Sequence, residues 1–190
     1  MGLDGKATDK RRIQDNNGNV MKFSSEGAIY SKTCENLKVI EGDLFYAEIY
    51  ESSLADGNSI TMGIIIPDGN IFHGILCIES DDSLVAEVYE NVTFTGGSSV
   101  TVYNVNRTSS NSSGATIVKN PTVSSYGTKI ETIIGGSAGG KFSSGQSPSY
   151  SSGANWMFKP NAKYLIKVTN DSGDASKVKV SYLFHLDAVS

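Results

Sequence analysis

The chain has 190 residues, of which 38% are hydrophobic, and it contains 20 glycines but only 4 prolines. This composition is too apolar and too weakly charged for a disordered chain, and it is typical of a β-protein with many turns. The net charge of −4 is unevenly distributed: residues 1–34 carry +2, residues 35–90 carry −11 and residues 91–190 carry +5. No basic stripe interleaved with aromatic residues is present, so we expect no nucleic acid partner.

The N-terminal part of the sequence is predicted to be an arm. We assign residues 1–40 to an N-terminal arm and attachment segment, and residues 41–190 to a β-sandwich domain. The first 19 residues have no apolar period, and Lys10, Arg11 and Arg12 form a basic cluster. Two interpretations stay open: a solvated tail, or an arm that becomes ordered only against a partner, with these three residues at the interface.

Beyond the arm, segments with a two-residue period follow one another between turns. In the clearest, 176–186, every second residue from Val178 to Leu186 is apolar, and Leu183 is an apolar exception on the other face. The segment 71–79 is nearly apolar on both faces, which predicts a central strand covered on both sides. Further strands are predicted at 43–51, 59–66, 84–91, 99–104, 129–134 and 163–170.

No segment has the apolar spacing of a long amphipathic helix, so helix is expected to be a minor component. The Ser/Gly/Asn-rich segments at 107–115 and 135–153 are predicted to be loops within one domain. Eight or nine short strands fit two antiparallel sheets packed face to face. The predicted fold class is therefore all-β: an antiparallel β-sandwich, with a jelly roll as the expected form, preceded by an extended N-terminal arm.

The two cysteines and the apolar runs limit the class of protein further. Cys34 and Cys77 are too few for a disulfide framework, and Cys77 is predicted to be buried as a small hydrophobic side chain. The longest apolar runs, at 63–67 and 74–78, are far too short to span a bilayer. We expect no signal peptide, because no apolar stretch follows a basic start. A membrane partner is therefore not expected.

A serine motif is the strongest candidate for catalysis. Residues 135–139 match G-x-S-x-G around Ser137, and Asp171 or Asp174 and then His185 follow in the order of a Ser-Asp-His triad. A nucleophile elbow needs a strand before the serine and a helix after it, but Gly/Ser-rich sequence follows here. We therefore predict that the protein is not an enzyme and has no catalytic residue.

Metal and cofactor sites are not expected either. Cys34, Cys77, His73 and His185 lack the local spacing of a zinc site, and both histidines fall within predicted strands. The acidic turns at 81–82 and 171–174 offer hard oxygen ligands for a weakly bound calcium ion. Neither turn has EF-hand spacing, so a polar turn is the preferred interpretation.

Three aromatic residues in predicted loops are candidates for stacking on sugar rings. They are Tyr126, Tyr150 and Trp156. Trp156, which is followed by Met157 and Phe158, is better interpreted as a core residue whose indole N–H finds a hydrogen-bond partner. A glycan site on these aromatic residues stays an alternative.

The second half of the chain carries motifs in a fixed order. A strand ends in Asn104, Asn106 and Arg107, with the pattern N-x-N-R, and a Gly-rich turn follows at 135–140. The pattern W-x-x-K-P-N-x-x-Y-x-x-x-x-T-N-x-S-G then runs over residues 156–173. From about residue 87 to residue 187, the chain resembles a family of tailed-bacteriophage accessory virion structural proteins, of the capsid decoration or head-fibre type with a jelly-roll fold.

The resemblance implies a non-enzymatic virion protein that is assembled in the host cytoplasm. Its implied partners are the major capsid protein or other virion proteins, and further copies of itself, with a trimer favoured. A receptor- or glycan-binding module of a tail fibre or spike is the alternative function.

The same motifs also have a physical interpretation. Pro160 presets a turn before the strand at 163–170, and Asn161 and Asn170 can close turns through side-chain bonds to the backbone. Arg107, just past a strand end, can hold a carboxylate or a pair of carbonyls with two hydrogen bonds. For the three N-x-N-R residues, both a structural role and a role at an interface stay open.

Overall fold

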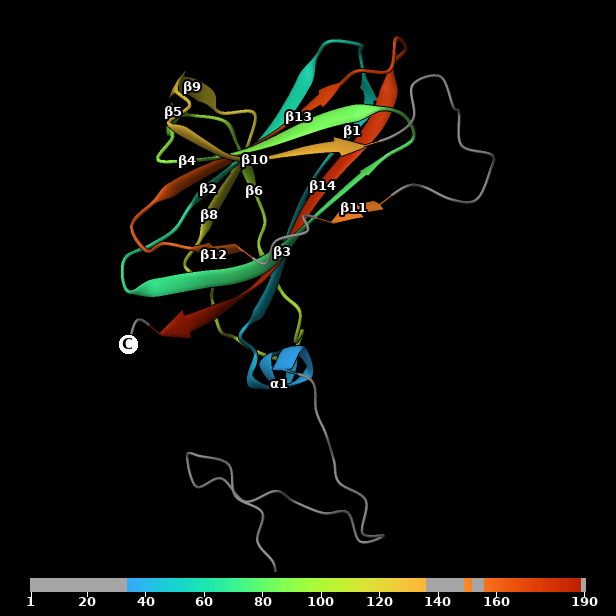
Figure 1. The fold of residues 1–190 in the computed structure, drawn as a ribbon. Coiled ribbons are helices and arrows are strands. Elements are labelled where there is room, and N and C mark those ends of the chain that lie inside the picture. The colour runs from blue at the N-terminus through green and yellow to red at the C-terminus, as the bar shows by residue number, and fades with distance from the viewer. Residues whose placement is uncertain (1–33, 136–148, 152–155, 189–190) are drawn as a thin grey trace, which may run out of the picture. The chain divides into compact units, whose positions relative to one another are not determined.

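The computed structural model describes residues 34–135, 149–151 and 156–188, and these residues form one helix and fourteen strands (Figure 1). The helix, α1, spans Cys34–Glu41. Residues 38–190 form one compact unit, and residues 1–37 form another, of which only the start of α1 is described. The basic cluster at Lys10, Arg11 and Arg12 lies outside the described residues. All paired strands are antiparallel, which confirms the predicted all-β antiparallel class.

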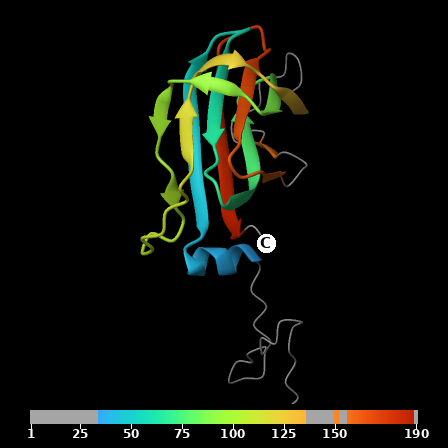
Figure 2. The ribbon, with the colours of Figure 1, turned by 90° about the vertical axis from the view of Figure 1, so that its left-hand side faces the viewer.

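The first sheet contains the longest strands of the protein. Its strand order is β11-β3-β14-β1-β7, and β12 also pairs with β3. Among the described strands, the first and the last along the chain, β1 and β14, lie side by side (Figure 2). The bounds are β1 (Leu44–Leu54), β3 (Asn70–Ser80), β7 (Tyr103–Asn104), β11 (Ser149–Ser151), β12 (Trp156–Phe158) and β14 (Ser176–Ala188).

The second sheet packs against the first, and a short ribbon accompanies it. Its strand order is β10-β4-β13-β2-β8-β6, and β5 and β9 form the separate two-stranded ribbon. The bounds are β2 (Ser59–Ile65), β4 (Leu84–Glu90), β6 (Ser98–Val100), β8 (Thr116–Lys119), β10 (Thr128–Gly135) and β13 (Lys163–Asn170), with β5 (Thr93–Thr95) and β9 (Thr122–Ser125) in the ribbon.

The core lies between the two sheets because the alternation in each strand sends every second side chain inward. Alternate side chains of β1, β2, β13 and β14 are buried between the sheets, so the β-sandwich that the sequence predicts is confirmed at this level. The inward residues of these four strands are Phe45, Ala47, Ile49, Ile60, Met62, Ile64, Tyr164, Ile166, Val168, Val178, Val180, Tyr182 and Phe184.

Aromatic side chains fill the middle of this core. The rings of Phe158 and Tyr164 stack at 3.9 Å between centroids, and Tyr182 lies 5.5 Å from Phe158 and 4.9 Å from Phe184. The Tyr164 hydroxyl accepts a hydrogen bond from the Lys159 amide at 2.9 Å. Burial raises the pKa of Tyr182 far above its ordinary value, so this phenol stays neutral at physiological pH.

Trp156 connects the edges of the two sheets. Its indole N–H donates to Glu131 Oε2 at 2.8 Å, and Glu131 belongs to β10 of the second sheet. The side chain is half-buried and packs against the core. Both parts of the sequence prediction for Trp156, the core contact and the N–H partner, are therefore confirmed.

Two parts of the strand prediction are wrong. The predicted strand at 99–104 is two strands in different sheets, because the chain crosses from β6 to β7 at residues 101–102. The short strands β5, β8, β9, β11 and β12 are not in the prediction, because three or four residues are too few to show an alternating pattern.

Asn170 closes the turn before β14, as predicted. Its side chain is fully buried and its amide nitrogen donates to the carbonyls of Leu54 and Asp174, each at 2.7 Å. Its side-chain oxygen accepts from the Ser172 amide at 3.1 Å, so the buried amide group is satisfied on both sides. Asn161 acts differently from the prediction: it turns the chain through a left-handed backbone conformation, with φ of 53°.

Candidate interaction surface

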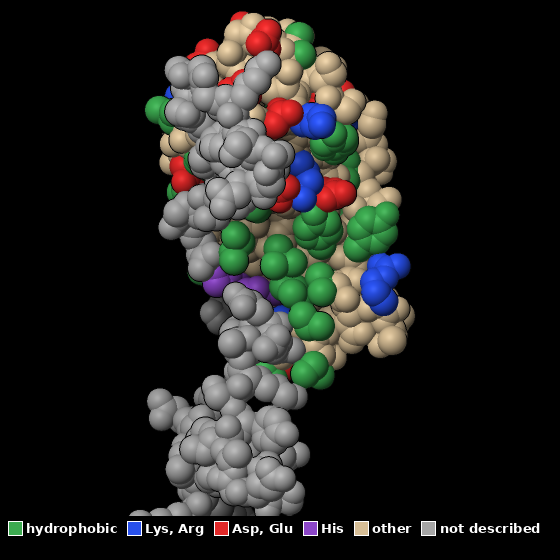
Figure 3. Space-filling view, turned by 90° about the vertical axis from the view of Figure 1, so that its right-hand side faces the viewer, with side chains coloured by type: hydrophobic (Ala, Val, Ile, Leu, Met, Phe, Trp, Pro, Cys, Tyr) green, Lys and Arg blue, Asp and Glu red, His purple; other side chains and the backbone are tan. Residues whose placement is uncertain are grey.

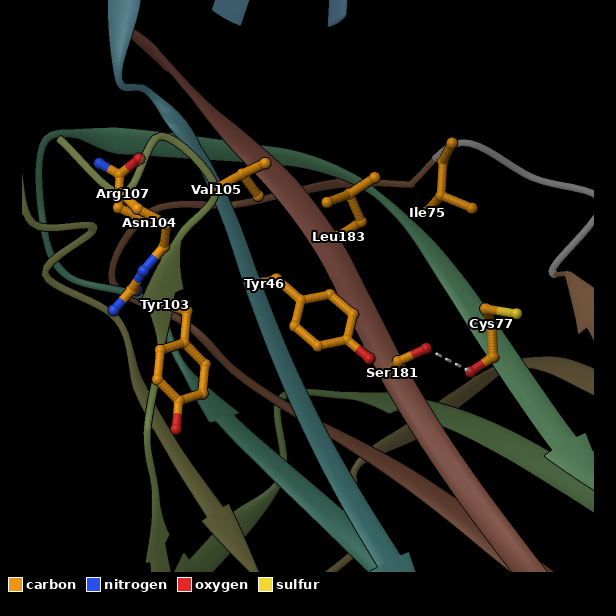
Figure 4. Close-up of a pocket in the computed structure, with 9 residues that line it drawn as sticks. All are labelled: Tyr46, Ile75, Cys77, Tyr103, Asn104, Val105, Arg107, Ser181 and Leu183. Carbon is orange, nitrogen blue, oxygen red and sulfur yellow. Dashed lines mark hydrogen bonds between the residues drawn. The ribbon is translucent and has the colours of Figure 1, made fainter. Parts of the chain in front are cut away.

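The outer face of the first sheet carries an apolar row that runs across four strands. The registers place Ile75 of β3 opposite Leu183 of β14, Leu183 opposite Tyr46 of β1, and Tyr46 opposite Tyr103 of β7. Figure 4 shows these side chains on the same side of the sheet. All four are partly exposed, and Tyr103 has 48% of its surface in solvent.

Small side chains in the next row make a hollow beside this apolar row. Cys77 lies opposite Ser181, and Ser181 opposite Glu48, while the row after that pairs Glu79 with Lys179. The hollow has a volume of about 710 Å³ and is open along the sheet face. Figure 3 shows the hydrophobic side chains gathered on this face, with histidines at their border and acidic and basic side chains beyond one end.

Cys77 lines this hollow, so the prediction that it is buried is wrong: it is half-buried and lies on the outer face. The Ser181 hydroxyl donates to the Cys77 carbonyl at 3.4 Å. Partial burial raises the pKa of the Cys77 thiol, and Glu79 raises it further. A thiol with a raised pKa is a poor nucleophile, so Cys77 acts here as apolar lining.

The charged groups around the hollow are largely paired. Lys179 Nζ lies 3.0 Å from Glu79 Oε1, and this contact raises the pKa of Lys179. The Tyr46 hydroxyl donates to Glu48 Oε2 at 2.5 Å. Burial and then this carboxylate raise the pKa of Tyr46, so the phenol stays neutral and the row remains uncharged at physiological pH.

The N-x-N-R residues form the loop at the β7 end of the hollow. Asn104 Nδ2 donates to the Gly42 carbonyl at 2.7 Å, and Asn104 Oδ1 accepts from the Asn106 amide at 2.9 Å. Asn106 Oδ1 in turn accepts from the Thr108 amide at 3.1 Å. These bonds give both asparagines a structural role, and they hold Val105 and Arg107 beside the apolar row.

Arg107 contacts an aromatic ring. Its guanidinium carbon lies 5.3 Å from the ring centroid of Tyr103, and the side chain also lines the hollow. Among the described residues, no carboxylate or carbonyl group binds this guanidinium. The predicted clamp of Arg107 on a carboxylate or on two carbonyls is therefore not formed within the described part of the chain.

The outer face of the second sheet also has an apolar row, but that row is covered. The registers align Tyr89 of β4, Leu165 of β13, Gly63 of β2 and Val118 of β8. Val92 and Phe94, from β5 and the residues before it, pack on this row and bury Leu165 completely. The two outer faces thus differ: the β5–β9 ribbon covers one apolar row, and no described strand or helix covers the other.

The other site predictions fall on separate parts of the chain. Ser137 lies outside the described residues, and His185 is the cross-strand neighbour of His73, with ring centroids 4.8 Å apart. Asp81 and Asp82 accept hydrogen bonds from the Lys177 and Ser83 amides, which are polar-turn contacts. Within the described ranges, no three His, Cys, Asp or Glu side chains form a group that could hold a metal ion.

The three candidate aromatic residues for a glycan site lie on different elements. Tyr126 follows β9 and packs on Tyr89 with 5.1 Å between ring centroids, whereas Trp156 on β12 bonds to Glu131. Tyr150 is part of β11. Two of these rings are therefore engaged by other side chains of the protein.

Two signals in the sequence point to the hollow: Leu183, the exception in the 176–186 pattern, and the second apolar face of 71–79. The prediction that 71–79 is covered on both sides is wrong for the described residues, in which Ile75 stays partly exposed.

No helix among the described residues is both long and apolar enough to cross a membrane. No family model, curated protein or solved structure matches the chain.

Proposed function

We propose that this chain is a non-enzymatic structural protein of a tailed-phage particle, which docks on the major capsid protein or another virion protein through the outer face of its first sheet. The observation that carries the proposal is the open apolar row of Ile75, Leu183, Tyr46 and Tyr103. Monomeric soluble proteins rarely expose contiguous apolar patches larger than a few hundred Å², and patches of that kind mark interaction sites. The resemblance of residues 87–187 to accessory virion proteins gives this partner its class.

We also propose that the sandwich is a jelly roll. Its main strands pair as the two arms of one long hairpin: β1 with β14, β2 with β13, β3 with β11 and β12, and β4 with β10. The further pairs β14 with β3 and β13 with β4 divide this hairpin between the two six-stranded sheets. With β11 and β12 counted as one interrupted strand, this nested pairing involves eight strands in two packed sheets, which supports the jelly-roll proposal; capsid proteins use this fold.

The docking face has the chemistry of a protein interface. Aromatic and arginine side chains are enriched at such interfaces, and the face offers Tyr46, Tyr103 and Arg107 together with Ile75 and Leu183. A homo-oligomer, with a trimer favoured, belongs to the same proposal because the resemblance to accessory virion proteins implies it. The particle is the proposed location.

Co-sedimentation with particles that lack this protein tests the proposal. The wild-type chain is expected to bind and to saturate at a fixed number of copies per particle. Leu183→Glu places a charge in the middle of the apolar row, and it should abolish binding while circular dichroism and thermal midpoint stay nearly unchanged. Thr132→Glu, at an exposed position of β10, is the matched control and should bind like the wild type. Equal saturation by Leu183→Glu, or no binding by the wild type, contradicts the proposal.

A further inference from the structure

We propose that the hollow between β7 and β3 binds an acidic, apolar segment of the partner protein, with an apolar side chain over Cys77 and Ser181 and a neighbouring carboxylate on Arg107. This inference rests on the proposed function, because it names the chemistry of the surface that the docking face recognises. The occupant is a protein segment, and Arg107 is a specificity-determining residue for it.

Arg107 is held ready for a carboxylate. Its guanidinium lies over the Tyr103 ring at 5.3 Å, and Tyr103 is fixed by its pairing with Tyr46. Stacking on a ring uses the face of the guanidinium and leaves the N–H donors at its edge, which is the geometry that binds a carboxylate through two parallel hydrogen bonds. The loop before it is fixed by the hydrogen bonds of Asn104 and Asn106. A preset side chain loses less conformational entropy on binding.

The charges of the face select an anion over a cation. No Asp or Glu is among the described residues that line the hollow, and Arg107 is the charged residue among them. Beyond the lining, Lys179 is paired with Glu79, and Glu48 accepts from Tyr46. Of these two cations at the hollow, Lys179 has an anionic partner, and Arg107 has none among the described residues. Charge complementarity therefore places a carboxylate of the partner at this end of the hollow.

The shape of the hollow favours a segment of a protein over a free small molecule. Sites for small molecules are concave and bury most of the ligand surface. This hollow is open along the sheet face, and apolar side chains of four neighbouring strands line it (Figure 4). One side chain of a protein segment can enter the hollow while the rest of the same segment covers Tyr46 and Leu183. The partner therefore needs an apolar residue and an acidic residue close together in its sequence.

Peptide titration followed by two-dimensional NMR of the isolated, full-length protein tests this inference. The probe is the acetylated, amidated peptide Ser-Leu-Phe-Asp-Gly, and two control peptides replace Asp by Asn or replace Leu-Phe by Ala-Ala. The Asp peptide should give saturable shifts at Ile75, Leu183 and the 103–107 loop. The Asn peptide should bind about tenfold more weakly, as should the Ala-Ala peptide. Affinity should fall as salt is raised for the two peptides that keep Asp, and the Asn peptide should show no such dependence.

The Arg107→Gln variant provides the decisive comparison. Arg107 is exposed, so the variant should fold like the wild type. It should lower affinity for the Asp peptide about tenfold and leave affinity for the Asn peptide unchanged, whereas Arg107→Lys should give an intermediate loss. Equal binding of the Asp and Asn peptides by the wild type, or shifts outside the hollow, overturns the inference.

Two further outcomes separate this inference from the proposed function. Shifts of the hollow residues that depend on protein concentration alone would show a second copy in the hollow and would overturn the acidic-segment assignment. If no peptide binds but Leu183→Glu still abolishes attachment to particles, the docking face stands and the inference about Arg107 fails. If the peptides bind as expected but the wild-type protein does not co-sediment with particles, the docking partner is not a virion protein.

Discussion

The ring of Phe94 occupies the space that a side chain at Gly63 would fill. A β-carbon built on Gly63 lies 2.9 Å from Phe94 Cζ, well inside van der Waals contact. Gly63 lies in the middle of β2, between Leu165 and Val118 on its neighbouring strands. The missing side chain therefore lets the β5–β9 ribbon close onto the second sheet and bury its outer apolar row.

We predict that Gly63→Ala destabilises the protein by about 1–3 kcal/mol, because the new methyl group overpacks the contact with Phe94 and Val118. Urea unfolding at equilibrium measures the loss. Phe94→Ala removes the ring, so the double variant should cost less than the sum of the two single variants. Additive losses would contradict the proposed steric contact.

Asn170→Ala should cost roughly 2–5 kcal/mol of unfolding free energy. The substitution leaves the Leu54 and Asp174 carbonyls and the Ser172 amide without their side-chain partner, and Leu54 is buried. Asn58→Ala, at an exposed position in the neighbouring turn, is the matched control and should change stability by less than about 0.5 kcal/mol. Similar losses for the two variants would show that the buried amide bonds contribute little.

Trp156 is the single tryptophan of the chain, so tryptophan fluorescence reports on the surroundings of this one side chain, which include its bond to Glu131. Glu131→Ala removes the acceptor of the indole N–H, and we expect a shift in the emission spectrum and a loss of about 1 kcal/mol of stability. Thr132→Ala, the next residue on β10, should leave the spectrum unchanged. An unchanged spectrum in Glu131→Ala would mean that the bond is absent in solution.

Acid should weaken the contact between β4, β10 and β13. The hydrogen bond from Lys129 lowers the pKa of Glu87 below its ordinary value of 4.5, and Lys167 contributes as well. The stability from Glu87 is therefore fully present above about pH 4.5 and is lost as the pH falls through the lowered pKa of the folded state. Unfolding free energies measured from pH 3 to pH 7 should fall less steeply with acid in Glu87→Gln.

Lys129→Met tests the cause of that shift, because it removes the first donor to Glu87 and keeps the aliphatic part of the side chain. It should also flatten the acid dependence of stability, though less than Glu87→Gln, since Lys167 remains 3.7 Å from the carboxylate. An acid dependence that equals the wild-type curve in both variants would contradict the assignment.

Strands with a strict two-residue period were predictable from the sequence, and the shortest strands were not. In β2 the residues Ile60, Met62 and Ile64 alternate with less apolar positions, and all three are buried as predicted. The ribbon was missed because β5 has three residues and a single buried one, Phe94. Its position depends on Gly63, and a glycine inside a strand says nothing about which distant ring will lie over it.

The candidate site was predictable only in part. The N-x-N-R pattern drew attention to Arg107, but its place beside Leu183 depends on the pairing of β7 with β1 and of β1 with β14. The apolar outer side of 71–79 was visible in the sequence, and we interpreted it as covered. Whether a face is covered is decided by the tertiary arrangement of other segments, so alternation in one strand cannot reveal it.

The pairing of the first strand with the last has a consequence for how the protein is made. Phe45 of β1 lies opposite Phe184 of β14, and β3 pairs with β14 along its whole length. A nascent chain that ends before residue 176 therefore has no partner for the facing edges of both strands. The first sheet can close only after residues 176–188 have left the ribosome, and until then β1 and β3 each present an unpaired edge to other chains.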